Sequence, residues 1–560
     1  MKKRHITTLL SASLIVIPMV EGAQYRVVEL PLASLAGNSF PSAINAAGTI
    51  SVNLQNQYNP TIDFTLLDFD SEPLLSYLTD IESAKGWDLN DSDYTYVYSY
   101  IMANSGNQTF QQIATYNGYL ADESSSELLH GFDTIDNTSG EYRNSATLMV
   151  RGLNDFGNAV GLSQDGFYTL SYVTDDVVDV TYVLNDFYSR GFALIEGKTV
   201  GLLPPDTTAG GLSDAYDINT SNQVVGVATT EMVSSSFQTS VEACSDPEQR
   251  GDIPEASCLR SLSVELNNNV GSIAQRRGII WQLDEKGNTT ETLQLGMLIS
   301  PDSTDSSIYS SSAVAINDYG VAVGASPAFY ADTGSLTTAA AFYINDEVLT
   351  INPDDENFSS VATDVNNDNV AVGYATKSIS GLTKTKFFVH DINTDLTSFP
   401  EDFFASSGSV ANSINNQGMV VGYGESEAVS GTRRTEGFLY DYRNNLFVGL
   451  NSLLECNSPY TISQANAIND DNEIAATALV TGPARDITGA IILDDLGAET
   501  EVDYVVAVKL VPISGGSIDN CDAYEEEVVR QGASFTWLAF LGLFVGVLRF
   551  RQQANKPTNP

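Results

Sequence analysis

The sequence predicts an all-β protein, a β-propeller of about seven or eight four-stranded blades. Three observations predict this fold: a composition that favours strands, a ten-residue phrase that recurs along the chain, and the spacing between its copies. Hydrophobic residues make up 42% of the 560 positions, and 26 Tyr and 24 Phe accompany many Thr, Ser and Val, which favours strands over helices and excludes a mainly disordered chain. An open β-solenoid is the alternative architecture, because it also stacks repeated strand pairs.

Each copy of the recurring phrase predicts a tight turn. In "AINDYGVAVG", which begins at residue 315, an apolar residue precedes an asparagine, and glycine stands three positions later. In the other copies this later position is Gly or Asn, the two residues that most readily accept positive φ, as the last residue of a type I turn with a bulge requires. The predicted turn residues are Asn45 and Gly48, Asn154 and Gly157, Asn219 and Asn222, Asn317 and Gly320, Asn366 and Asn369, Asn415 and Gly418, and Asn469 and Asn472.

Two hairpins make up each predicted unit. A small, branched strand such as "VAVG" follows the turn, and a second hairpin such as "TKTKFFVHDINTDLTSFP" separates one copy from the next. Four strands in about 40 to 50 residues are the signature of propeller blades. We expect "QYRVVEL" near the start to pair in one blade with "GAIILDDL" and "DYVVAVKLVPI" near the end, which would close the ring and remove its free edges.

Two long intervals between copies predict insertions, near residues 68–127 and 236–262. The first contains "GWDLNDSDYTYVYSY", which we interpret as an aromatic-rich degenerate blade, with a binding surface as the alternative. The second contains the tripeptide Arg250-Gly251-Asp252, which invites an adhesion hypothesis but arises easily by chance. Long loops on a rigid scaffold are where binding usually resides.

The sequences at the two ends predict that the protein is located at the cell envelope. A basic start and a short apolar run predict a secretory signal peptide over residues 1–23, and the uncharged run before Arg549 and Arg551 predicts a transmembrane or sorting helix. The protein is therefore expected to be exported across the inner membrane and either anchored in the periplasm or released to the cell surface. The predicted parts are the signal peptide, a repeat domain at 24–513, a linker at 514–532, the helix at 533–550 and a cytoplasmic tail at 551–560.

Export gives the four cysteines a structural role. Their spacing fits no zinc motif, so disulfides are the default in an oxidising compartment, although four cysteines allow three pairings. The pairs that we predict are Cys244 with Cys258, closing the second insertion, and Cys456 with Cys521, tying the last repeat to the segment before the helix.

The charge balance limits the partners. Lys and Arg total 26 against 71 Asp and Glu, and the formal net charge of -45 opposes binding to nucleic acids and to anionic membrane surfaces. Such acidity usually gives solubility and tolerance of salt, although it is compatible with cationic ligands. The residues inside the turns vary freely, so no metal is predicted, and calcium at Asp368 or at Asp470 and Asp471 remains the alternative.

Catalytic motifs are scarce. Once His5 leaves with the signal peptide, only His130 and His390 remain, and both are interpreted as residues of the aromatic strands. No HExxH, P-loop, GxSxG or dinucleotide-binding motif occurs, so neither a cofactor nor a catalytic residue is predicted. Glycoside cleavage needs only two carboxylates, and propellers host such enzymes, so a glycosidase or lyase is the alternative to a binding protein.

Two patterns resemble known families. The pairing of Gly191-Phe192, Ala341-Phe342 and Gly437-Phe438 with the turn hairpins resembles the HAF-type repeats of bacterial extracellular proteins. The tail from Gly532 resembles the GlyGly-type C-terminal sorting signals that a rhomboid-like protease recognises. The whole chain is similar to a Gram-negative secreted family of unknown function, which implies an extracytoplasmic location and a propeller-like fold but no catalytic residues.

These observations predict an exported, envelope-associated, non-enzymatic binding or scaffolding propeller. Its expected partners are a protein or glycan ligand, the membrane through the C-terminal helix, and the sorting protease.

Overall fold

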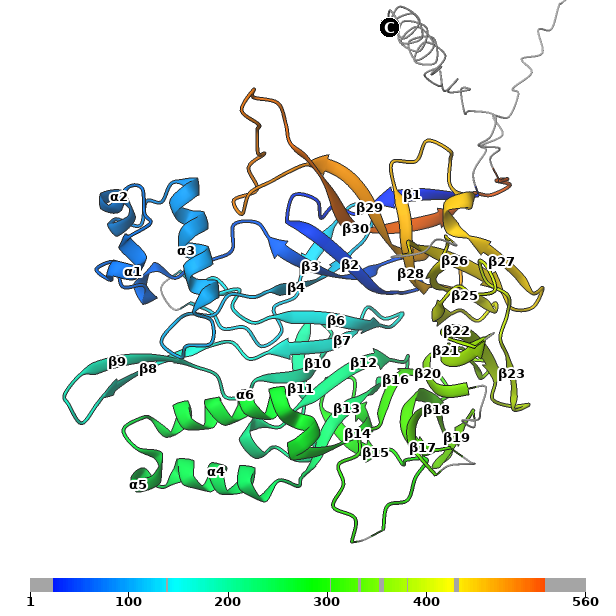
Figure 1. The fold of residues 1–560 in the computed structure, drawn as a ribbon, viewed down its shortest axis with the longest axis horizontal. Helices are drawn as coiled ribbons and strands as arrows, with labels where there is room; N and C mark the ends of the chain where they lie inside the picture. Colours follow the sequence, from blue (N-terminus) through cyan, green and yellow to red (C-terminus); the bar gives the residue numbers. More distant parts are fainter. Residues whose placement is uncertain are drawn as a thin grey trace, which may run out of the picture. The chain divides into compact units, whose positions relative to one another are not determined.

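A computed structural model describes residues 24–518 of the chain except 137–138, 303, 331–333, 352–356, 380 and 428–432. Seven four-stranded antiparallel sheets form the blades of a β-propeller (Figure 1). The predicted fold class is confirmed, and the number of blades is seven. The predicted signal peptide and C-terminal helix lie outside the described residues.

We number the blades 1 to 7 along the chain. Blade 1 consists of β2 (Ala36–Ile44), β3 (Ile50–Gln57), β4 (Tyr116–Ala121) and β5 (Ser126–Leu128). Blade 2 consists of β6 (Leu148–Leu153), β7 (Ala159–Gln164), β10 (Ser189–Ile195) and β11 (Lys198–Leu202). Blade 3 consists of β12 (Ser213–Ile218), β13 (Gln223–Met232), β14 (Ala274–Leu283) and β15 (Thr289–Gln294). Blade 4 consists of β16 (Ser312–Ile316), β17 (Ala322–Phe329), β18 (Leu336–Ile344) and β19 (Glu347–Thr350). Blade 5 consists of β20 (Asn357–Val365), β21 (Val370–Ile379), β22 (Leu382–Asp391) and β23 (Leu396–Ser398). Blade 6 consists of β24 (Ser409–Ile414), β25 (Met419–Glu425), β26 (Thr435–Asp441) and β27 (Leu446–Gly449).

Blade 7 closes the ring with strands from both ends of the described chain. It consists of β28 (Thr461–Ile468), β29 (Ile474–Pro483), β30 (Glu501–Pro512) and β1 (Tyr25–Glu29). Strand β1 pairs antiparallel with β30, with Val27 opposite Leu510. The predicted pairing of the terminal segments is therefore confirmed for "QYRVVEL" and "DYVVAVKLVPI", and the open solenoid is wrong.

The segment "GAIILDDL" does not form a blade strand as expected. It lies in the β29–β30 connection, where Ile491 and Leu493 make only isolated bridges. The side chains of Asp486 and Asp494 each accept hydrogen bonds from main-chain N–H groups two and four residues ahead, which favours two successive turns over a continuous strand.

The recurring asparagines and their partners form the turn between the first and second strand of every blade. At all seven predicted positions the backbone is left-handed, with φ values of 75° at Gly48, 80° at Gly157, 56° at Asn222, 81° at Gly320, 60° at Asn369, 81° at Gly418 and 61° at Asn472. The asparagine side chain fixes the same turn: Asn366 Oδ1 accepts hydrogen bonds from the N–H groups of Asp368 (3.1 Å) and Val370 (3.0 Å).

The same side chains also connect each blade to the next. In each case the Nδ2 group donates to the main-chain carbonyl of the corresponding asparagine in the following blade, and the side chain of blade 7 donates to blade 1. The seven bonds, of 2.9 to 3.3 Å, run from Asn45 to Asn154, Asn219, Asn317, Asn366, Asn415, Asn469 and back to Asn45. These side chains are 4 to 6% exposed. We call this closed circuit the asparagine ring.

A β-bulge in each first strand ends two residues before the ring asparagine. In blade 5 the residue there is Asp364, which accepts hydrogen bonds from the N–H of Val365 and from Ile414 of the next blade, both at 2.8 Å. Asp217 does the same in blade 3. Desolvation inside the ring of strands, together with the repulsion of the nearby Asp217 carboxylate, raises the pKa of Asp364 to about 7.

The bulge also explains the glycine of the "VVG" and "VAVG" strands. A Cβ atom on Gly373 would lie 2.1 Å from the carbonyl oxygen of Val361 across the bulge, and one on Gly422 would lie 2.0 Å from that of Val410. Only glycine permits this close approach of two backbones.

Aromatic residues of the third strands fill the space between blades. Phe387 of β22 and Phe438 of β26 are fully buried with ring centres 4.9 Å apart. His390 lies in β22 as expected, stacked on Phe342 at 4.5 Å, with Nδ1 hydrogen-bonded to Thr397. Its environment is that of a core residue.

The first long interval holds helices, not a degenerate blade. Residues 58–115, between β3 and β4, contain η1 (Phe64–Leu66), α1 (Glu72–Leu75), α2 (Ile81–Lys85) and α3 (Asp91–Ala103). Asn90 caps α3 by accepting from the N–H of Asp93, and Val97 and Ile101 lie buried one turn apart on the same face. The expectation of an aromatic strand here is wrong because this cap and this spacing favour a helix.

The second insertion is also helical and longer than expected. It contains α4 (Ser235–Ser245), α5 (Pro247–Arg250) and α6 (Glu255–Ile273), between β13 and β14. A further hairpin, β8 (Tyr168–Val173) with β9 (Asp179–Leu184), separates β7 from β10. Within the described part of the chain, no helix combines the length and apolar character needed to cross a membrane.

Replacing Asn366 by alanine should lower the free energy of unfolding by about 3 kcal/mol or more, because two N–H groups and one carbonyl lose their partners in a buried site. Urea unfolding of the full-length chain measures this change. Asn367→Ala removes side-chain hydrogen bonds at the exposed surface of the same turn and should cost less than about 1 kcal/mol. Equal effects of the two substitutions would contradict the role of the ring.

The buried carboxylate of Asp364 predicts a pH dependence. Its folded pKa of about 7 lies above the ordinary 3.8, so the folded chain holds a proton that the unfolded chain releases between these values. The unfolding free energy of the wild type, relative to Asp364→Asn, should therefore fall by about 2–4 kcal/mol as pH rises from about 4 to about 7. Urea unfolding at several pH values across this window tests it, and a relative stability that stays constant or rises would refute it.

Candidate functional site

Three insertions gather on the face of the propeller opposite the asparagine ring. Each occupies the connection between the second and third strands of its blade, and in an antiparallel sheet this connection leaves from the end opposite the first turn. Figure 1 shows α1–α3, the β8–β9 hairpin and α4–α6 on one side of the blades. We call residues 58–115, 168–184 and 235–273 together the insertion crown.

Gln108 joins the three parts of the insertion crown. Its carbonyl accepts from the N–H of Val183 in the hairpin (2.6 Å). Its side chain donates to Ser261 Oγ (2.8 Å) and accepts from Ser257 Oγ (2.7 Å), both on α6. The crown is thus one connected surface.

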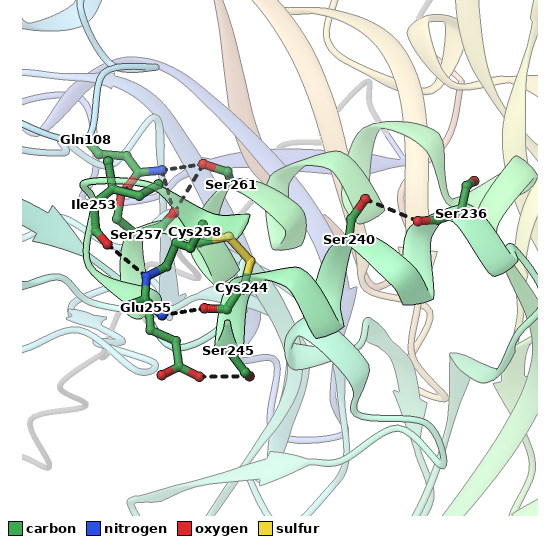
Figure 2. The surroundings of a disulfide bond; sticks show 11 residues. Gln108, Ser236, Ser240, Cys244, Ser245, Ile253, Glu255, Ser257, Cys258 and Ser261 are labelled. Atoms are coloured by element: carbon green, nitrogen blue, oxygen red, sulfur yellow. Dashed lines mark hydrogen bonds between the residues drawn. A yellow bond between two sulfur atoms is a disulfide. The ribbon is translucent and has the colours of Figure 1, made fainter. Parts of the chain in front are cut away.

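A disulfide between Cys244 of α4 and Cys258 of α6 ties the second insertion together, as Figure 2 shows, with Cα atoms 5.6 Å apart. Arg250 donates to the carbonyls of Cys244 (2.6 Å) and Ile253 (2.9 Å). Cys521, the predicted partner of Cys456, lies outside the described residues.

The Arg-Gly-Asp tripeptide is part of this internal network. Besides the contacts of Arg250, Asp252 accepts hydrogen bonds from the hydroxyl of Tyr172 (3.1 Å) and the N–H of Asp175 (2.8 Å) in the β8–β9 hairpin. Both charged side chains therefore hold parts of the crown together, which opposes the adhesion hypothesis.

A cleft of about 750 Å³ lies between the first insertion and the segment that follows β5. Its lining includes Phe64, Trp87, His130, Tyr142, Arg143 and Phe167. The size falls within the range of about 300–1,000 Å³ that is usual for small-molecule sites. This cleft is the candidate binding site.

Arg143 fixes the base of the cleft. Its guanidinium forms ion pairs with Asp63 of the first insertion (2.7 Å) and with Asp136 (2.9 Å), and lies 4.9 Å from the ring centre of the buried Phe167. Gln111 accepts from the N–H of Asp63 and donates to its carbonyl, both at 2.8 Å. The Asp63–Arg143 ion pair therefore fastens the insertion to the β5–β6 connection, and the Gln111 bonds fix the position of Asp63 within the insertion.

Aromatic groups form the walls. His130 and Tyr142 stack with ring centres 3.6 Å apart and planes 8° apart. The interpretation of His130 as a strand residue is wrong: β5 ends at Leu128, and Gly131 takes a φ of 57°, so the chain leaves the sheet before His130 can pair. Desolvation lowers the pKa of His130, which keeps the imidazole neutral at pH 7.

The arrangement suits binding better than proton transfer. Both Asp63 and Asp136 accept charge-assisted hydrogen bonds from Arg143, so these two carboxylates of the cleft are already paired within the protein. Among the described residues, no three His, Cys, Asp or Glu side chains form a group that could hold a metal ion. In the acidic turn copies, Asp470 accepts hydrogen bonds from the N–H and the side chain of Asn416.

The predicted turn residues and this cleft lie on opposite faces. The asparagines surround a small opening of about 190 Å³ at the propeller axis. The segment "GWDLN", which the sequence marks as part of a candidate surface, includes Trp87, whereas no sequence pattern marks Tyr142 or Arg143. Arg143 lies 80 residues from Asp63, and no local pattern marks such a pair.

Solved structures that are similar to parts of this chain include three peptidases. The acylaminoacyl peptidase of Pyrococcus horikoshii is 10% identical, with a TM-score of 0.33, covering 86% of this chain and 54% of that one. The dipeptidyl peptidase 4 of Porphyromonas gingivalis is 10% identical (TM-score 0.28; 70% and 54% covered), and a puromycin-hydrolyzing peptidase of Mycobacterium tuberculosis is 12% identical (TM-score 0.25; 66% and 54% covered). The chain spans about half the length of these proteins. At such low sequence identity and TM-score, the likeness assigns no activity to this chain.

No curated protein matches the chain. One family, described as "Protein of unknown function (DUF3466)", matches residues 4–553, nearly the whole length. The chain belongs to this family.

Proposed function

We propose that the protein is an exported, envelope-associated, non-enzymatic binding propeller whose ligand enters the cleft of the insertion crown. The observation that carries this proposal is the cleft itself. It has aromatic walls and a base fixed by ion pairs, and it is built by an insertion on a rigid seven-bladed scaffold. Binding sites commonly arise in this way, from long loops that a stable framework positions.

The export part of the proposal is supported by the sequence. The basic and apolar start, the HAF-like strand pairs and the sorting-like tail all indicate a protein of the cell envelope. The disulfide in the crown suits an oxidising compartment. We further propose that the C-terminal helix contacts the membrane and that a rhomboid-like protease acts on the tail.

Catalysis by paired carboxylates is the less favoured function. A glycosidase needs one carboxylic acid that keeps its proton near neutral pH. Asp63 and Asp136 each form an ion pair with the guanidinium of Arg143, so their oxygens are engaged by a cation of the protein itself. Binding without cleavage fits this geometry better.

We expect the purified full-length chain to be retained by at least one envelope polysaccharide in affinity electrophoresis, without release of new reducing ends. Arg143→Gln should weaken retention about tenfold or more, because the insertion loses its ion pairs to the base of the cleft. Arg434→Gln, at an exposed position of blade 6, is the matched control and should bind like the wild type.

Two results would contradict the proposed function. Reproducible release of reducing ends that Asp63→Asn or Glu141→Gln abolishes would establish the enzymatic alternative. Equal retention of the Arg143 and Arg434 variants would show that the ligand binds elsewhere.

A further inference from the structure

We infer that the ligand of the cleft is a neutral oligosaccharide, one sugar ring of which lies on the exposed face of Trp87. This inference rests on the proposed function, because it names the ligand class of the same cleft. Three features of the lining carry it: the exposed ring, the internal neutralisation of charge and the fixed amide groups.

Trp87 contributes an exposed aromatic ring to the lining of the cleft. The residue is 54% exposed, and the ring of Phe64 lies behind it with centres 6.4 Å apart and planes 22° apart. A flat, supported aromatic face suits the apolar C–H face of a sugar ring.

The backbone at Trp87 has a strained conformation for a residue with a bulky side chain. The residue follows the C-cap of α2 with a φ of 65°, and its N–H donates to the carbonyl of Ala84 (2.9 Å). Glycine or asparagine usually occupies this left-handed position, and a bulky side chain there is strained. Stability alone would not select tryptophan, and strain of this kind clusters at functional sites.

The charges of the cleft disfavour an ionic ligand. Arg143 already donates to Asp63 and Asp136, and His130 is neutral, so an anionic sugar would find no available cation among the described lining residues. A cationic ligand would meet carboxylates that are already bound, apart from the exposed Glu141. Neutral hydroxyl groups avoid both penalties.

Amide side chains supply fixed hydrogen-bonding groups. Gln112 and Asn144 are partly exposed in the lining; Gln112 donates to Asn185 at 3.0 Å and Asn144 donates to Thr61 Oγ1 at 3.2 Å, so both are oriented before a ligand arrives. Preorganised donors and acceptors lose little entropy when they bind a sugar hydroxyl.

Titration calorimetry of the full-length chain with defined hexasaccharides tests the inference. The probes are three neutral hexamers (laminarihexaose, maltohexaose and N-acetylchitohexaose), one anionic hexamer (mannuronate) and one cationic hexamer (glucosamine). At least one neutral hexamer should bind, with an affinity that changes little between low and high salt. The charged hexamers should bind at least about tenfold more weakly.

Two variants and a control assign the site. Trp87→Asn removes the ring and suits the left-handed backbone, so it should fold with an equal or higher unfolding midpoint and lose at least about tenfold in affinity. Trp87→Phe should retain most of the affinity. Tyr77→Ala removes an aromatic residue that is 72% exposed on the same insertion but outside the cleft, and should bind like the wild type.

The inference is overturned if only a charged hexamer binds, if none binds, or if Trp87→Asn binds a neutral hexamer as tightly as the wild type. The proposed function stands in each of these cases if Arg143→Gln still weakens retention of an envelope polysaccharide about tenfold or more. The proposed function alone is contradicted if Arg143→Gln leaves that retention unchanged.

Discussion

The asparagine ring is the constraint on which the fold depends. Each of the seven side chains uses its oxygen to hold the turn of its own blade and its nitrogen to bind the next blade. Aspartate lacks the donor and serine lacks the reach, whereas the asparagine amide carries both the acceptor and the donor that the ring uses. Where the turn ends in asparagine, that residue adds another link, as Asn369 Oδ1 does by accepting from Asn317 Nδ2 at 3.0 Å.

This constraint acts on the turns at one face of the propeller and leaves the connections at the opposite face free to differ in length and structure. The first turns meet at the axis, and the bulges and glycines beside them require close backbone contact. The connections on the opposite face carry no such requirement, and blades 1 to 3 use them for helices and a hairpin. The cleft arises there because Arg143 links the first insertion to the blade below it.

The turns and blades were predictable from the sequence because their causes are local. Gly or Asn at a fixed position of the turn indicates a left-handed backbone, and the regular spacing of the turns indicates four strands in each repeat. The ring itself was not predictable, because the partner of each Nδ2 group lies in another blade. The helix α3 was missed because Tyr94, Tyr96, Tyr98 and Tyr100 alternate as in a strand, although the Asn90 cap indicated a helix. Trp87 lay in a segment interpreted as a candidate surface. Arg143 was not identified, because its partner in the first insertion, Asp63, lies 80 residues away in the sequence.

Hydrogen exchange of the asparagine side-chain amides tests the central claim most directly. In a chain with ¹⁵N-labelled asparagine, the account predicts that the seven NH₂ groups of the asparagine ring exchange with solvent far more slowly than the exposed ones, all seven becoming labile together as the propeller unfolds. Exchange of the ring amides at the rate of exposed asparagines, or protection confined to some blades, would contradict a closed ring.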